Sequence, residues 1–331
     1  MQESLSGITN PTNAIEGRRR VPIERAHNLT PEIFYERYLT GVGKPVIVTD
    51  EMNSWNARSK WNLDFFRSRY GSDTVLPTVW PGTKYAKLMK LADYIGYIQS
   101  PNEKSPGIWI DPETKFPLPG PPENLSGPLY LYGWKAFDLH PELFDDISQN
   151  LKSVEDWLPL LPAALRKVMN ETTRYYSHGV LIGPANSKSH LHQDFLHSHA
   201  YLAQIVGRKK CTLFSPEDSA VLYDGDVDPD RPALDQFPLF RNATAFECVL
   251  EPGELLFMPS LWWHHVIALE NSITVNCNFF NRVNFTAYFT DLLQRVPALV
   301  QGIEKLPDAK KALDINWTSK GFDFPDRTKT G

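Results

Sequence analysis

Two histidine-rich stretches contain the residues best suited to chemistry. His192 and Asp194 stand two positions apart, and His264 follows a pair of tryptophans much later in the chain. Residues two apart in an extended segment point to the same face, so this imidazole and this carboxylate can hold one metal ion together. With His264 as a third ligand, the set leaves coordination positions open, which is the arrangement of non-haem Fe(II) oxygenases. We therefore predict a metal site made by His192, Asp194 and His264.

The context of these residues favours a metal site over a chance match. An H-x-D triplet alone is common in proteins without a metal, but five of the nine histidines here lie between residues 178 and 199. His264 and His265 add two more. Both clusters border segments rich in aromatic and β-forming residues, where strands could present them together.

Composition indicates an ordinary globular chain. Its 331 residues suffice for one large or two small domains, and 42% are hydrophobic and 22% charged. A net charge of −5 argues against nucleic acid or an anionic membrane as an obligatory partner. No apolar run approaches the roughly 20 residues of a membrane helix, and the N-terminus lacks a signal-peptide pattern. Three separated cysteines provide no disulfide framework, so we expect a reducing, cytoplasmic setting.

The first half of the chain reads as a flexible tail followed by mixed helices and strands. Residues 1–20 have no periodicity, and the basic run at 18–20 favours a solvated tail end over a nucleic-acid contact. Residues 21–170 are expected to form an N-terminal elaboration, with strands at 46–49 and 129–132 and helices near 31–39, 62–70, 91–98, 141–147 and 162–168. Trp55 and Trp61 are expected in its core. The segment 101–128 is crowded with proline and glycine, which predicts a long loop of the kind that often covers a site.

A change of period near residue 173 predicts a β-rich core over residues 171–282. Eight strands are expected, at 175–176, 180–182, 201–206, 211–214, 246–250, 254–258, 263–268 and 273–280. Many short strands separated by turn residues indicate a sandwich or barrel, and a barrel of eight strands can hold one small ligand.

Two further segments leave alternatives open. Aspartates alternate from Asp224 to Asp230, but a calcium loop requires glycine and glutamate where this chain has Pro229 and Asp235, so a solvated loop is favoured. The C-terminal segment 283–331 begins with a helical apolar pattern. A helix with that much apolar surface covers the sheet or pairs with a second copy in a homodimer, and the sequence favours both equally.

At this point the chain resembles the cupin-fold, JmjC-type Fe(II)/2-oxoglutarate oxygenases. The similarity is to the branch with the asparaginyl hydroxylase of hypoxia-inducible factor and the tRNA wybutosine hydroxylase, and it covers about residues 20–280. It is carried by ordered motifs at compatible spacing: Val21-Pro22, Thr30-Pro31, residues 44–47, Trp61, His192-Gln193-Asp194, residues 204–216, 238–240, 251–254, 257–259 and 262–265. The resemblance implies a fold that is mainly β with flanking helices, namely a double-stranded β-helix (jelly-roll or cupin) barrel with an N-terminal α/β elaboration and C-terminal helices.

The resemblance also implies roles for single residues. It makes His192, Asp194 and His264 the iron ligands and places His265 away from the metal or behind it. Lys209 matches the lysine that pairs with the far carboxylate of 2-oxoglutarate. A cation is needed there because a dianion that enters a dry barrel must have its remote charge neutralised. Lys210 would face the other way.

Further contacts to the cosubstrate are implied on both sides of the cavity. Tyr130 resembles a tyrosine that donates to the same carboxylate, with Tyr132 as the alternative. Ser189 occupies a position where a relative has a hydroxyl. Asn278 matches an asparagine near the iron, and Thr274 and Asn276 alternate with it, so all three would share the inner face.

The sequence departs from the family pattern after the H-x-D motif. The family commonly has an asparagine six residues after the first ligand, whereas this chain has a segment over 195–200 that is about two residues longer. His197, Ser198 or His199 could take that role, or the loop could follow another route.

The expected function is hydroxylation of an unactivated C–H bond with Fe(II), 2-oxoglutarate and O2, which yields succinate and CO2. A small-molecule or peptide substrate is favoured over nucleic acid, and a protein side chain remains open. Three alternatives stand beside it: demethylation through an N-methyl hydroxylation, a catalytically silent cupin that binds a metal or ligand, and a cupin that uses another metal without 2-oxoglutarate.

Overall fold

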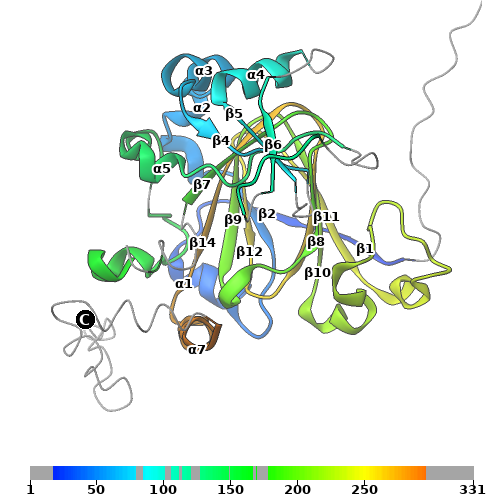
Figure 1. Ribbon diagram of the computed structural model, residues 1–331. Helices are drawn as coiled ribbons and strands as arrows, with labels where there is room; N and C mark the ends of the chain where they lie inside the picture. Colours follow the sequence, from blue (N-terminus) through cyan, green and yellow to red (C-terminus); the bar gives the residue numbers. More distant parts are fainter. Residues whose placement is uncertain are drawn as a thin grey trace, which may run out of the picture.

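The computed structural model describes residues 18–79, 85–100, 106–111, 114–120, 127–148, 150–166, 169 and 178–295, with two β-sheets at its centre (Figure 1). Within these residues one sheet has the strand order β2 (Glu24–Ala26), β3 (Val46–Val48), β12 (Leu255–Met258), β9 (His199–Val206), β14 (Ser272–Phe279) and β7 (His178–Gly183). The other has the order β1 (Arg20–Pro22), β11 (Ala245–Leu250), β10 (Lys209–Phe214), β13 (Trp263–Ala268) and β8 (Lys188–His192).

The strands from β7 to β14 are distributed over both sheets and pair with one another in antiparallel fashion. The order β7-β14-β9-β12 in one sheet and β8-β13-β10-β11 in the other is consistent with the expected double-stranded β-helix of cupins. An apolar cluster with members from both sheets, among them Leu202, Leu213, Leu256 and Val266, indicates that the sheets pack face to face.

Seven of the eight predicted strands correspond to strands of these sheets, and the eighth prediction, at 175–176, lies outside the described residues. Three strands of the two sheets were not predicted from the sequence: β1 and β2 near the N-terminus, and β8, which lies in the predicted β-rich core and carries His192. The sequence of β8, KSHLH, is polar and lacks the β-branched and aromatic residues that mark strands. Pairing with β13 makes it a strand nevertheless.

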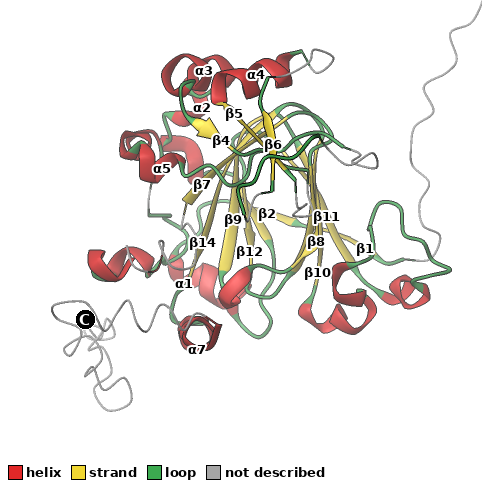
Figure 2. Ribbon diagram, viewed as in Figure 1, coloured by secondary structure: helices red, strands yellow, loops and turns green. Residues whose placement is uncertain are grey.

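The N-terminal helices largely follow their capping signals. Thr30 caps α1 (Pro31–Phe34), which continues as a π-helix over Tyr35–Leu39, and Asn62 accepts a hydrogen bond of 2.8 Å from the amide of Phe65 at the start of α3 (Leu63–Tyr70). Helices α2 (Ala57–Lys60), α4 (Leu91–Gln99) and α5 (Ala136–Leu139) complete this part, and 3₁₀ turns replace the helix expected near 141–147. Figure 2 shows α3 and α4 at one end of the sheets and α7 (Phe285–Arg295) at the other. Trp55 and Trp61 are buried in the core, as predicted.

A small sheet of β4 (Thr74–Val75), β5 (Ala86–Lys90) and β6 (Ile108–Ile110) lies beside the main pair. Strand β6 falls inside the segment 101–128 that was expected to be a loop, and much of the rest of that segment lies outside the described residues. The strand expected at 129–132 is reduced to two bridges, from Tyr130 to Thr78 and from Leu131 to Ile182. These bridges attach the small sheet to β7.

The expectation of a solvated basic run is wrong for Arg18. Its side chain is buried against the rings of Phe214 and Phe240, and its Nη2 lies 3.2 Å from Oε1 of Glu247 on β11. The ion pair and the aromatic faces compensate for the desolvation of the guanidinium. Among the described residues, no helix is both long and apolar enough to cross a membrane.

Candidate metal and cosubstrate site

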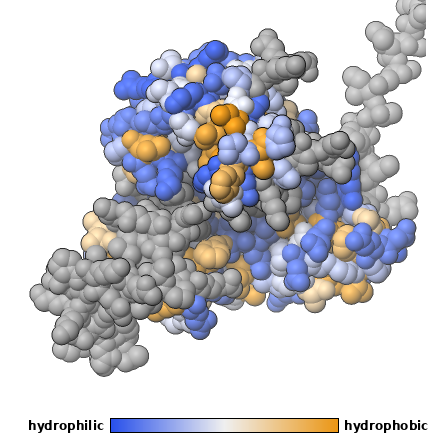
Figure 3. Space-filling view, viewed as in Figure 1, coloured by the Kyte–Doolittle hydropathy of each residue, from blue (hydrophilic) through white to orange (hydrophobic). Residues whose placement is uncertain are grey.

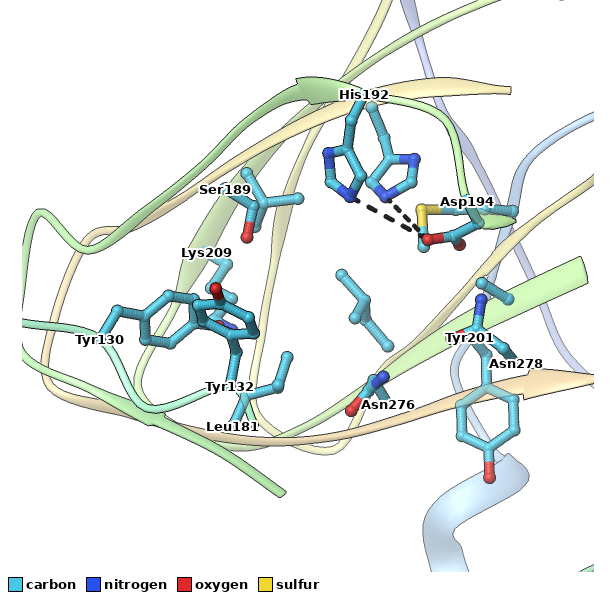
Figure 4. Close-up of a pocket in the computed structure, with 15 residues that line it drawn as sticks. Tyr130, Tyr132, Leu181, Ser189, His192, Asp194, Tyr201, Lys209, Asn276 and Asn278 are labelled. Atoms are coloured by element: carbon cyan, nitrogen blue, oxygen red, sulfur yellow. Dashed lines mark hydrogen bonds and ion pairs between the residues drawn. The ribbon is translucent and has the colours of Figure 1, made fainter. Parts of the chain in front are cut away.

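Strand pairing brings the two histidines of the predicted triad together. His264 on β13 is the register partner of His192 on β8, and their ring centroids are 4.1 Å apart. Asp194 follows β8 in extended conformation, with Oδ1 4.0 Å from Nε2 of His192 and 3.8 Å from Nε2 of His264 (Figure 4). The three ligand atoms all lie within 4.8 Å of one another, so one ion can contact all of them.

The ring orientations of both histidines suit metal binding. Nδ1 of His192 lies 2.7 Å from the carbonyl oxygen of His190, and Nδ1 of His264 lies 3.1 Å from that of Trp262. Because a carbonyl only accepts, each Nδ1 carries the hydrogen and each Nε2 presents its lone pair towards Asp194. Burial, with a contribution from His264, lowers the pKa of His192 to about 4, which keeps this imidazole neutral. Two imidazoles and one carboxylate fit Fe(II).

A cavity of about 140 Å³ extends from the triad into the space between the sheets. Its wall contains the predicted residues Tyr130, Ser189, Lys209, Asn276 and Asn278 together with the triad. The other residues of its wall are Tyr132, Leu181, Ala200, Tyr201, Leu202, Met258 and Val266. Most of these were not singled out from the sequence.

Lys209 places a buried cation at the far end of the cavity from the triad. Gly207 turns the chain from β9 to β10 with a φ of 71°, and a side chain there would place its Cβ 2.3 Å from the carbonyl oxygen of Asn271. Lys209 follows at the start of β10 and is only 2% exposed. Its Nζ donates a hydrogen bond of 3.2 Å to the hydroxyl of Tyr130.

The Lys209 ammonium lacks a compensating charge. Within the described part of the chain, no carboxylate forms an ion pair with it, and burial lowers its pKa to about 8. Burial also raises the pKa of Tyr130, so that the phenol keeps its hydrogen and can donate it to an anion. A buried cation beside a hydroxyl donor is suited to a carboxylate ligand.

The polar residues of β14 differ in their surroundings. Asn276 lines the cavity, and its buried Oδ1 has no hydrogen-bond partner among the residues that the structure describes. Asn278 also lines it, and its Nδ2 donates to Oγ of Ser198 at 3.0 Å. Thr274 does not reach the cavity wall, because its hydroxyl donates to Oε1 of Gln204 at 2.8 Å.

The lengthened segment after Asp194 reaches the cavity wall only with its last residue, Ala200. His197, Ser198 and His199 are all absent from the cavity lining. Ser198 is connected to the cavity indirectly, because its Oγ accepts a hydrogen bond from Nδ2 of the cavity residue Asn278. Nδ1 of His199 instead accepts a hydrogen bond from the amide of Ser260 at 3.0 Å.

A second group of metal-type side chains lies on the other face of β13. Nε2 of His265 is 3.0 Å from Oδ2 of Asp230, and Asp228 completes the group. Nζ of Lys210 lies 2.5 Å from Oδ1 of Asp230, and Nζ of Lys188 lies 3.6 Å from Oδ2 of Asp228. Both carboxylates therefore already have cationic partners, which indicates an ion-pair network.

Comparisons with known proteins show the family of the chain. The family profile described as "Cupin-like domain" matches residues 128–285. The tRNA wybutosine-synthesizing protein 5 of Mus musculus is 41% identical over 268 residues, which cover 78% of each chain. The chain belongs to the cupin-like, JmjC-type family of 2-oxoglutarate-dependent dioxygenases. The predicted family is thereby confirmed.

Other members of the JmjC-type family are similar over most of this chain. Lysine-specific demethylase 8 of Danio rerio is 31% identical over 287 residues, which cover 81% of this chain and 59% of the relative. Lysine-specific demethylase JMJ21 of Arabidopsis thaliana is 27% identical over 281 residues, or 80% of this chain. The chain spans only about a quarter of that plant protein (26%).

Proposed function

We propose that this chain is an Fe(II)/2-oxoglutarate-dependent oxygenase that hydroxylates an unactivated C–H bond of an amino acid, peptide or other small molecule. The observation that carries the proposal is a single cavity with a triad of His192, Asp194 and His264 at one end and the buried Lys209 at the other. Bound iron, with 2-oxoglutarate and O2, supplies the oxidising chemistry and leaves succinate and CO2 as co-products.

Different side chains of the cavity would bind the metal, bind the cosubstrate and exclude water. His192, Asp194 and His264 hold the metal through Nε2, a carboxylate oxygen and Nε2. Lys209 and Tyr130 bind the far carboxylate of the cosubstrate, and Ser189, Asn276 and Asn278 add polar contacts along its length. The apolar wall residues exclude water, which strengthens these charge interactions.

The surface near the small sheet supports a role in substrate contact. Ile108 on β6 is 56% exposed and Phe116 is 71% exposed. Figure 3 shows apolar surface gathered in the region of β6 on an otherwise largely hydrophilic face. Because the small sheet joins Tyr130 of the cavity wall through Thr78, we assign the substrate rim to this side. The acidic loop 224–235 is a weaker candidate, since Asp228 and Asp230 are engaged in ion pairs.

A macromolecular substrate is the second candidate. The relatives are named as lysine-specific demethylases and as tRNA wybutosine-synthesizing protein 5, so a protein side chain, an N-methyl group or a tRNA base would be the target. The net charge of −5 favours the first two over tRNA. A catalytically silent cupin accounts poorly for Lys209, because a buried unpaired cation destabilises a fold that does not bind an anion.

The test is succinate release from 2-oxoglutarate with Fe(II) in air, for the wild type and for Asp194→Ala. Cell extract is separated by size into a metabolite fraction and a macromolecular fraction, and each is added in turn. We expect triad-dependent stimulation by the metabolite fraction. Stimulation by the large fraction alone would replace the small-molecule proposal with the second candidate. The oxygenase would be ruled out if Asp194→Ala released as much succinate as the wild type, or if no fraction led to succinate release.

Two further proposals concern the whole chain. The apolar face of α7 packs on Leu196 and Phe280, yet Leu293 on the same helix is 48% exposed, which supports a homodimer through the C-terminal segment. Sedimentation velocity would show it as twice the chain mass. The cytoplasmic setting stays a prediction from cysteine usage, which fractionation of the source cells would check.

A further inference from the structure

The side chain between the first two metal ligands points away from the cavity. His192 and Asp194 face the cavity, so the alternation of an extended segment turns Gln193 to the opposite side. Nε2 of Gln193 donates a hydrogen bond of 2.6 Å to the carbonyl oxygen of Leu261. Leu261 lies in the turn between β12 and β13, three residues before His264. One side-chain contact therefore joins the segment with two ligands to the turn that delivers the third.

That turn is held in an unfavourable conformation. Leu261 has a φ of 64°, in the left-handed region that a branched side chain rarely adopts. Such a conformation persists only where the surroundings fix it. The indole of Trp262 donates to the carbonyl oxygen of Val42 at 2.9 Å, and Gln193 holds Leu261 itself.

The segment after Asp194 is strained as well. Leu196 and His197 have φ values of 60° and 52°, again in the left-handed region. Oγ of Ser260 donates to the carbonyl oxygen of His197 at 2.8 Å, and the Ser260 amide donates to Nδ1 of His199 at 3.0 Å. Two strained segments, one that begins two residues after Asp194 and one three residues before His264, are thus bonded directly to each other.

Helix α7 braces the same segment from its other side. Nδ2 of Asn284, at the start of the helix, also donates to the carbonyl oxygen of His197, at 2.8 Å. Oδ2 of Asp291 lies 3.5 Å from Nδ1 of His197. The backbone after Asp194 is therefore fixed between the helix and the 259–262 turn.

We propose that Gln193 and Ser260 are positioning residues for the metal triad. They bind the 259–262 turn to the segment around Asp194 and so set the separation between the carboxylate and His264 before the metal arrives. The inference rests on the proposed function only in that the ion held is the metal of the triad. A ligand set fixed in advance binds its ion more tightly, because less ordering remains to be done on binding.

The experiment measures Co(II) binding to the metal-free full chain by visible absorption, with Co(II) as an oxygen-stable probe. Gln193→Ala is compared with Gln236→Ala, in which an exposed glutamine outside the site is truncated in the same way. We expect Gln193→Ala to weaken Co(II) binding by about 10- to 100-fold, as loss of a supporting hydrogen bond does at other metal sites. Gln236→Ala should bind as the wild type does.

A second measurement separates positioning from general loss of fold. Excess Fe(II) should restore most of the succinate release of Gln193→Ala, and the thermal unfolding of the metal-free protein should stay near that of the wild type. Should Gln193→Ala fail to fold, Ser260→Ala decides, with several-fold weaker Co(II) binding expected.

Co(II) binding within twofold of the wild type in the folded variant would overturn the positioning role. The metal assignment itself is tested separately by Asp194→Ala. If that variant retains wild-type Co(II) affinity, the triad fails, and with it the proposed function.

Discussion

The two faces of the five-stranded sheet carry the same kinds of side chain in different surroundings. On β13, His264 faces the cavity and the next residue, His265, faces away. On β10, Lys209 faces the cavity and Lys210 faces away. The register of the two strands places His264 and Lys209 on one face and His265 and Lys210 on the other.

The two faces have similar types of side chain but differ in whether their charged groups have partners of opposite charge. The cavity face has two histidines and one carboxylate, and the outer face has one histidine and two carboxylates, both at distances that a metal ion could bridge. Burial alone would raise the pKa of Asp230, but hydrogen bonds from His265 and Lys210 hold it well below its usual range. Asp194, in contrast, has no lysine or arginine partner among the described residues, and Lys209 has no carboxylate. The outer face is already neutralised, whereas the cavity face requires both a cation and an anion.

The largest effect that we expect from this difference is in metal stoichiometry. The wild type should bind one equivalent of Fe(II) or Co(II) per chain, and Asp194→Ala should bind none. Asp230→Ala should still bind one, because the outer group has lysines where a metal would sit. Elemental analysis after gel filtration gives the ratio. Two equivalents in the wild type, or none in Asp230→Ala, would show that the outer group is a metal site after all.

The next largest effect should appear in the affinity for 2-oxoglutarate. Lys209→Met removes the buried cation, and we expect the KM for 2-oxoglutarate to rise about 100-fold, since truncating one partner of a buried charge pair typically costs 2–5 kcal/mol. Lys210→Met is the matched control on the outer face and should leave the KM unchanged. Equal effects of the two substitutions would mean that the faces do not differ in function. Metal stoichiometry should remain at one in both variants.

Alternation within strands explains why much of this comparison could be predicted from the sequence. The opposite directions of Lys209 and Lys210, and of His264 and His265, follow once β10 and β13 are recognised as strands. Contacts between distant segments could not be read in this way. The burial of Arg18 depends on Glu247, the hydroxyl of Thr274 is taken by Gln204, and the polar β8 becomes a strand only through its partner.

The predicted triad could be assembled from the H-x-D spacing and one later histidine, but its support could not. Gln193 gives no signal in the sequence, because a glutamine between two ligands is as compatible with solvent as with a turn 68 positions away. Whether Gln193 faces solvent or the 259–262 turn is determined by strand register and loop geometry, and both depend on how the whole chain packs.

The smallest expected effect is the pH dependence of 2-oxoglutarate binding. It should distinguish Lys209 from Lys210 in the wild type, where both side chains are intact. Burial lowers the pKa of Lys209 to about 8, so its amine is charged below that pH and neutral above it. The KM for 2-oxoglutarate should therefore rise above about pH 8, by up to tenfold per unit. Lys209→Arg, whose guanidinium stays charged, should flatten this rise even if its KM is higher throughout.

The lowered pKa of Lys209 also means that the unfolded chain binds more protons than the folded one between about pH 8 and 10.5. Without cosubstrate, the contribution of Lys209 to stability should then increase with pH across that window. A KM that is flat from pH 7 to 9 in the wild type would show that Lys209 keeps its proton throughout that range, and the pH-dependent difference between the two lysines would disappear.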